Sequence, residues 1–94
     1  MVTIGMNYKV IPGKGEIFEN AFRNVLKVMA EIEGHSKSFL YKDVDDSNSY
    51  LIVSEWSSED AFNGFIRSEK FRNVANWGKE NILVGRPIHT VYKQ

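Results

Sequence analysis

A strand followed directly by a capped helix occupies residues 50–72 and constrains the fold more than any other part of the chain. Residues 50–56 are rich in β-branched and aromatic side chains, and apolar residues occur at both alternating positions, which predicts a strand covered on both faces. The next four residues, Ser-Ser-Glu-Asp, provide a hydroxyl N-cap and two acids for the first helical turn. Residues 68–71, Ser-Glu-Lys-Phe, look like a second cap, so we expect the helix to kink or restart there.

In the N-terminal part of the chain, the spacing of the apolar side chains changes once, from that of a strand to that of a helix. Residues 2–11 alternate between apolar and polar side chains, which predicts a strand that ends in the Pro-Gly-Lys-Gly turn. From residue 16 the apolar side chains recur at helical spacing, and this pattern continues to about residue 33. Gly34 suits the C′ position of that helix.

One further strand, which pairs with residues 50–56, and a final strand complete the pattern. Residues 38–44 and 50–56 flank a polar turn and should form a hairpin. Residues 77–81 are interpreted as a loop or a fraying helix end. Residues 84–93 predict a last strand, and Pro87 near its start indicates an edge position because proline cannot donate to a neighbouring strand.

The resulting order, β-α-β-β-α-β, predicts a ferredoxin-like fold of the α+β class over the single domain 1–94. Such a fold is an antiparallel sheet with both helices on one face. The other face is left open, yet the strand at residues 50–56 offers apolar side chains to both faces, which is costly in a monomer. We therefore expect a homodimer packed sheet to sheet.

Composition narrows the function classes. Twelve basic residues balance twelve acidic ones, so no basic face for nucleic acid is indicated. The absence of cysteine excludes disulfides, thiolate nucleophiles and cysteine-ligated metals. No window reaches the ~20 apolar residues of a membrane span, so no membrane partner is predicted. A cytoplasmic location is compatible with these features and is the expectation.

Familiar catalytic motifs are not found in the sequence. The glycine turn at residues 13–15 lacks the spacing of a phosphate-binding loop, and the acidic turn at residues 43–46 lacks the glycine and closing glutamate of a calcium loop. His35 and His89 are too few for a histidine metal site, so no metal site is predicted. Each histidine is interpreted as structural or surface-exposed, although a single histidine can ligate a haem iron.

The many aromatic side chains, 13% of the chain, point to an apolar pocket for a flat organic ligand, although most of the rings must form the core. Asn7 is an amide on the first predicted strand. It either points into a cleft under the helices, where it could bind a ligand, or faces solvent or the dimer partner.

Two runs of the sequence resemble a known family. W-S-S-E-D-A-F at residues 56–62 and S-E-K-F-R at residues 68–72 are similar to motifs of the antibiotic biosynthesis monooxygenase (ABM) family. The resemblance extends over essentially the whole chain, including a first strand with Asn7 and a long helix before Gly34. It implies ferredoxin-like protomers that form a dimeric α/β barrel, and an oxidoreductase activity of the monooxygenase type.

The haem-degrading branch of that family uses an asparagine, a tryptophan and an iron-ligating histidine. In this chain Asn7 matches the asparagine, Phe65 stands where the tryptophan would be, and Ala75 stands where the histidine would be. Alanine cannot ligate iron. If haem binds, the iron ligand is His35 or His89, or the haem is held without a ligand by apolar contacts alone.

The cofactor-free branch binds a polycyclic phenol that itself reacts with oxygen. Such a site requires mainly an apolar slot and a few hydrogen-bond donors for the developing oxyanion. The resemblance therefore favours a monooxygenase acting on a planar aromatic substrate with no required cofactor. The residues expected to act or to line the pocket are Asn7 and Phe65, with Phe22, Phe62, Phe71, Arg72 and Trp77. His35 and His89 are the candidate bases. The alternatives are a haem-binding or haem-degrading protein and a non-catalytic dimeric ligand-binding module.

Overall fold

In residues 1–85 and 88–93, which the computed structural model describes, four strands and three helices follow one another along the chain. In chain order they are β1 (Val2–Lys9), α1 (Gly15–Met29), β2 (His35–Lys42), β3 (Ser49–Trp56), α2 (Glu59–Ile66), α3 (Glu69–Asn81) and β4 (Ile88–Lys93).

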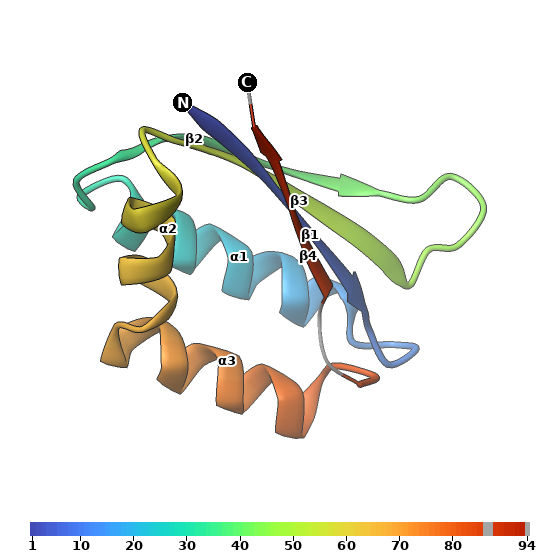
Figure 1. Ribbon diagram of the computed structural model, residues 1–94. Helices are drawn as coiled ribbons and strands as arrows, with labels where there is room; N and C mark the ends of the chain where they lie inside the picture. The colour runs from blue at the N-terminus through green and yellow to red at the C-terminus, as the bar shows by residue number, and fades with distance from the viewer. Residues whose placement is uncertain (86–87, 94) are drawn as a thin grey trace.

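The strands form one antiparallel sheet in the order β2-β3-β1-β4, and the helices lie on one side of it (Figure 1). Strand β1 is central and pairs with β3 on one side and β4 on the other. This is the ferredoxin-like arrangement, so the predicted α+β fold is confirmed. The edge position of β4 is also confirmed, whereas Pro87 lies outside the described residues.

Three elements in the first half of the chain have boundaries that differ from the prediction. Strand β1 ends at Lys9 and not at residue 11, and the end of α1 and both ends of β2, His35 and Lys42, also differ. Helix α1 ends at Met29, because the amides of Glu31 and Ile32 bond to carbonyls three residues back and tighten the chain into turns. Strand β2 begins at His35, before the predicted residue 38, and an irregularity between His35 and Lys37 shifts its register.

Both predicted helix caps are confirmed. The Ser58 hydroxyl accepts from the Ala61 amide at 3.1 Å, and the Ser68 hydroxyl accepts from the Phe71 amide at 3.3 Å. The helical region therefore breaks into α2 and α3, as the second cap motif indicated. Helix α3 then continues to Asn81, so residues 77–81 are helical.

Trp56 is the centre of the core and is fully buried. Its ring contacts Phe62 and Phe65, with centroids 5.8 and 5.4 Å away. The even-numbered residues of β1 face the helices and join this cluster, in which Ile4 is also fully buried. Within the described residues, no helix has the length and apolar character needed to cross a membrane.

The face of the sheet away from the helices carries exposed apolar side chains, as predicted. They are Phe39 (47% exposed), Tyr41 (54%), Ile88 (70%) and Tyr92 (57%). The strand register places all four on the same face as Leu51 and Val53 of β3, which are half-buried. We call these six residues the open sheet face.

Gly34 joins the end of the α1 region to β2 in a conformation that L-residues rarely adopt, with φ of +97°. A Cβ here would lie 2.6 Å from the Cβ of Ala61 in α2. We expect Gly34→Ala to lower the free energy of unfolding by about 1–3 kcal/mol, because it combines backbone strain with a steric clash.

Gly64→Ala is the matched control. Gly64 lies inside α2, and a Cβ at this position would point into open space. There the substitution should stabilise the protein by about 0.5–1 kcal/mol through helix propensity. Urea unfolding of both variants measures the difference, and equal effects would show that the Gly34 position is not constrained.

Candidate functional site

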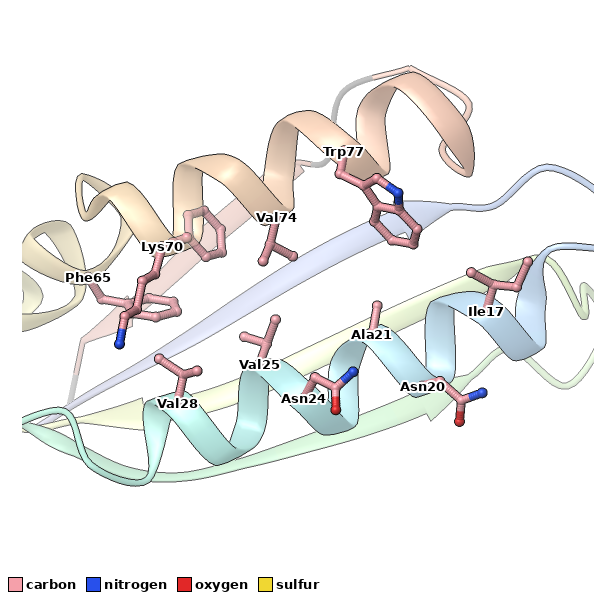
Figure 2. A pocket seen from close by; sticks show the side chains of 11 residues that line it. Ile17, Asn20, Ala21, Asn24, Val25, Val28, Phe65, Lys70, Val74 and Trp77 are labelled. Atoms are coloured by element: carbon pink, nitrogen blue, oxygen red, sulfur yellow. The ribbon is translucent and has the colours of Figure 1, made fainter.

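Helix α3 is held against the rest of the protein at its two ends. At its start, the Phe71 ring packs on Phe65 with centroids 4.8 Å apart. Beyond its last turn, the Ile11 amide donates to the Ile82 carbonyl and the Val84 amide donates to the Lys9 carbonyl, both at 2.8 Å. The middle of α3 faces α1 across a cleft (Figure 2).

Helix α1, the other wall, is joined to the sheet by a polar contact. The Tyr50 hydroxyl donates to Oε2 of Glu19 at 2.7 Å, and Nζ of Lys42 lies 3.3 Å from the same oxygen. These two partners, Tyr50 first, lower the pKa of the Glu19 carboxyl. The contact connects the first half of α1 to β2 and β3.

The cleft consists of two adjoining hollows of similar size. The outer hollow, about 400 Å³, lies between α1 and α3, and the inner hollow, about 410 Å³, reaches the sheet at Met6, Tyr8 and Ile52. Both are lined by Ala21, Val25, Phe71, Val74 and Trp77.

The outer hollow has aromatic rings toward both of its ends. In Figure 2, Val25 and Val74 point toward one another across the gap, with Phe65 and Lys70 toward one end and Trp77 toward the other. Such an apolar slot with few polar groups is typical of sites for flat organic ligands.

Polar side chains are sparse in the cleft. Asn20, Asn24 and Lys70 border the outer hollow, and Tyr8, Asn76 and Lys79 border the inner one. Neither a carboxylate nor a histidine occurs among the described residues that line the two hollows. The polar chemistry available there is hydrogen bonding by amide and hydroxyl groups, and positive charge.

Tyr8 is a lining residue that the sequence analysis did not single out. It lies on the core face of β1 beside Met6, and its ring packs on Phe18 with centroids 5.2 Å apart. Burial raises the pKa of its hydroxyl, so the group stays protonated. The sequence could have indicated this role, because Tyr8 is the residue with a polar group among the alternate, otherwise apolar positions of the first strand.

Five of the seven residues expected in the pocket do line the cleft. They are Phe22, Phe62, Phe65, Phe71 and Trp77. Phe62 and Phe65 are also core residues, so they form the closed end of the cleft.

The expectation that Asn7 points into the cleft is wrong. Asn7 is exposed and pairs with Leu51 and Ile88, so it belongs to the opposite face of the sheet. Arg72 is also exposed and lines neither hollow, because the helix turns its position away from that of Phe71.

His35, the histidine whose side chain the structure describes, lies outside the cleft. His35 Nε2 is 2.8 Å from the Ser38 hydroxyl, and its ring meets Trp56 edge-on at 5.1 Å. Burial lowers the pKa of His35, which keeps the ring neutral. His89 pairs with Met6 in the sheet, and its side chain lies outside what the structure describes.

Ala75 lines the inner hollow. Across the described part of the chain, no cluster of three or more His, Cys, Asp or Glu side chains could hold a metal ion. A site for a metal ion held only by such side chains is therefore not seen in that part.

Two proteins of known sequence are similar to nearly the whole of this chain. Over 87 residues, or 93% of the chain, it is 37% identical to a protein of Natronomonas pharaonis and 36% identical to one of Haloarcula marismortui. Both are named "putative heme-binding protein". The match covers only 14% and 13% of those proteins, so most of each relative has no counterpart in this chain.

Solved structures show the same fold. A cofactor-independent oxygenase from Streptomyces nogalater, SnoaB, superposes with a TM-score of 0.85 over 99% of this chain and 91% of its own, at 22% identity. A protein from Deinococcus radiodurans described as a "putative antibiotic biosynthesis monooxygenase" gives a TM-score of 0.88 over 100% and 92%, at 13% identity.

The sequence model of one family accounts for most of the chain. It covers residues 1–77, from the first strand to Trp77 within α3, and its description is antibiotic biosynthesis monooxygenase. Those residues include β1 to β3, α1, the first part of α3 and the two cap motifs. This chain belongs to the antibiotic biosynthesis monooxygenase family.

Proposed function

We propose that this chain is a monooxygenase that binds a planar, polycyclic aromatic substrate in the cleft between α1, α3 and the sheet. The substrate is a phenol or its keto tautomer, and its reaction with molecular oxygen needs no bound cofactor. Family membership supports the reaction class.

The observation that carries the proposal is the shape and lining of the cleft. Its two adjoining hollows of about 400 Å³ each fall in the range of small-molecule sites, and rings from three helices line them. Val25 and Val74 stand on opposite walls of the outer hollow (Figure 2), so a flat ring system fits between them better than a globular ligand.

The proposed chemistry balances without an external reductant. A polycyclic ketone such as anthrone loses a proton from its methylene carbon and becomes an electron-rich enolate. Oxygen adds to that carbon, one oxygen atom stays as a new carbonyl group, and the other leaves as water with the two methylene hydrogens. The substrate supplies all four electrons that reduce the oxygen molecule.

The contribution of the protein is to orient the rings, exclude water and favour the anion. Lys70 and Lys79 border the cleft and place positive charge near the developing enolate. Because Ser38 and Trp56 hold His35 outside the cleft, we do not assign His35 as the base. The proton passes to water at the mouth of the cleft.

Haem binding is the second candidate, favoured by the names of the relatives from Natronomonas pharaonis and Haloarcula marismortui. The cleft walls are apolar enough for a porphyrin, but the described lining contains no histidine to ligate iron. Those names describe whole proteins, of which this chain matches only 14% and 13%. The described lining does not fit a histidine-ligated haem.

We also propose that two copies of the chain pack through the open sheet face. Phe39, Tyr41, Ile88 and Tyr92 each expose close to half or more of their surface there. A contiguous apolar sheet face of this kind is typical of a protein interface. The helices and the cleft stay on the outside of such a dimer.

Anthrone tests the proposed activity. The protein should consume oxygen with anthrone and form anthraquinone, and Ala21→Trp should lower that rate at least about tenfold by filling both hollows, a change of roughly 1.4 kcal/mol or more. Ala30→Trp, an exposed alanine just after α1, should keep the rate. An oxygen electrode and product absorbance measure both, with circular dichroism as the folding control. An unchanged rate in Ala21→Trp would show that the reaction does not take place in the cleft.

Haemin tests the second candidate. Since no histidine occurs in the described lining, we expect haemin to produce no saturable shift of its Soret band when the protein is added. A saturable shift, followed by decay of the Soret band after a reductant is added under air, would instead make haem degradation the leading candidate function. The variants His35→Ala and His89→Ala would then identify the ligand by loss of the shift.

A charge on the open sheet face tests the dimer. We expect Phe39→Glu to convert a dimer into a monomer at micromolar concentration, because a buried unpaired carboxylate is strongly unfavourable. Val44→Glu is the matched control, since Val44 is 98% exposed in the β2–β3 hairpin. Sedimentation velocity measures the mass. A wild-type monomer, or a dimer in Phe39→Glu, would contradict this interface.

A further inference from the structure

We propose that the Tyr8 hydroxyl binds an oxygen atom of the ligand in the cleft, so that the site selects aromatic ligands carrying a carbonyl or phenolate oxygen over plain aromatic hydrocarbons. This inference rests on the proposed function, since it assigns a specificity-determining residue to the same cleft.

The hydroxyl of Tyr8 has no strong partner among the described residues. The acceptor within reach is the thioether sulfur of Met6 at 3.9 Å, which is a weak acceptor. Tyr50, which pairs with Tyr8 in the sheet, differs, because its hydroxyl donates to Glu19 at 2.7 Å. A part-buried hydroxyl without a good acceptor is unfavourable unless water or a ligand supplies one.

The position of Tyr8 directs this donor at the ligand. Tyr8 belongs to β1 at the floor of the inner hollow, where Met6 and Ile52 contribute only apolar atoms and a sulfur. The other polar groups of that hollow, Asn76, Trp77 and Lys79, come from α3 and are exposed to solvent. Tyr8 is therefore the polar group that meets the buried edge of a ring system.

The protonation state of Tyr8 defines the ligand atom that it binds. Its raised pKa keeps the phenol neutral near physiological pH, so the group donates a hydrogen bond and does not act as a base. The matching ligand atom is an acceptor. A carbonyl oxygen fits, and so does the oxyanion of an enolate or phenolate, which makes a stronger, charge-assisted bond.

A matched pair of ligands tests this assignment. Menadione is a methylated naphthoquinone, and the methylnaphthalene with its methyl group at the same ring position has a similar shape but no oxygen. The chain has no cysteine to which the quinone could add. Equilibrium dialysis of each ligand gives its dissociation constant for the wild type, Tyr8→Phe and Tyr41→Phe.

We expect Tyr8→Phe to weaken menadione binding about three- to tenfold, the effect of one lost hydrogen bond, and to leave methylnaphthalene binding unchanged. Tyr41→Phe, on the open sheet face, should change neither. Equal effects on both ligands, or on neither, would overturn the role of Tyr8 while leaving the cleft as a ring-binding site. Binding of neither ligand to the wild type would overturn the proposed cleft itself.

A spectroscopic measurement keeps the test independent of variant folding. In the wild type, the carbonyl stretching band of bound menadione should lie at lower frequency than that of menadione in an apolar solvent, because hydrogen bonding weakens the carbonyl bond. Tyr8→Phe should lose that shift while its thermal midpoint stays close to that of the wild type. An unshifted band in the wild type would refute the hydrogen bond even if Tyr8→Phe did not fold.

Discussion

The burial of Trp56 ties together the sheet, the β2–β3 hairpin and the helical region. The ring is fully buried at the end of β3, and it contacts Phe62 and Phe65 of α2 and the ring of His35 at the start of β2. The contact continues outward, because Phe65 packs on Phe71, which lines the cleft. The core and the candidate site therefore share the same aromatic contacts, and a substitution of Trp56 would alter the packing of both.

The cleft follows from how the two long helices are attached. Helix α3 is held at its start by an aromatic contact and beyond its end by two backbone hydrogen bonds, and α1 is joined to the sheet through Glu19 and Tyr50. Between these attachments the facing side chains include Ala21 and Val74, which are too small to fill the space. Close packing elsewhere leaves a gap of ligand size here, and a gap lined by apolar groups is stabilised by an apolar ligand.

The two faces of the sheet have different roles because a strand alternates its side chains. In β1, Met6 and Tyr8 face the helices, and Asn7 between them faces the open side. The hydrogen-bond donor that β1 contributes to the cleft is therefore the phenol of Tyr8, and the amide of Asn7 belongs to the face proposed for the second copy. Neighbouring positions in a strand lie on opposite faces of the sheet, so one can bind the ligand while the next belongs to the interface.

Local patterns in the sequence were enough to predict the element order, both serine caps, the edge position of the last strand and the aromatic composition of the site, because periodicity and capping depend on near neighbours. Five of the cleft residues came from the resemblance to the family together with the many aromatic side chains, and not from periodicity alone. The positions of Asn7 and Arg72 outside the cleft, and the contact of His35 with Ser38, emerged only from the folded chain. Those outcomes depend on which face of the sheet the helices cover and on where α3 crosses α1, which are set by contacts between residues distant in the chain.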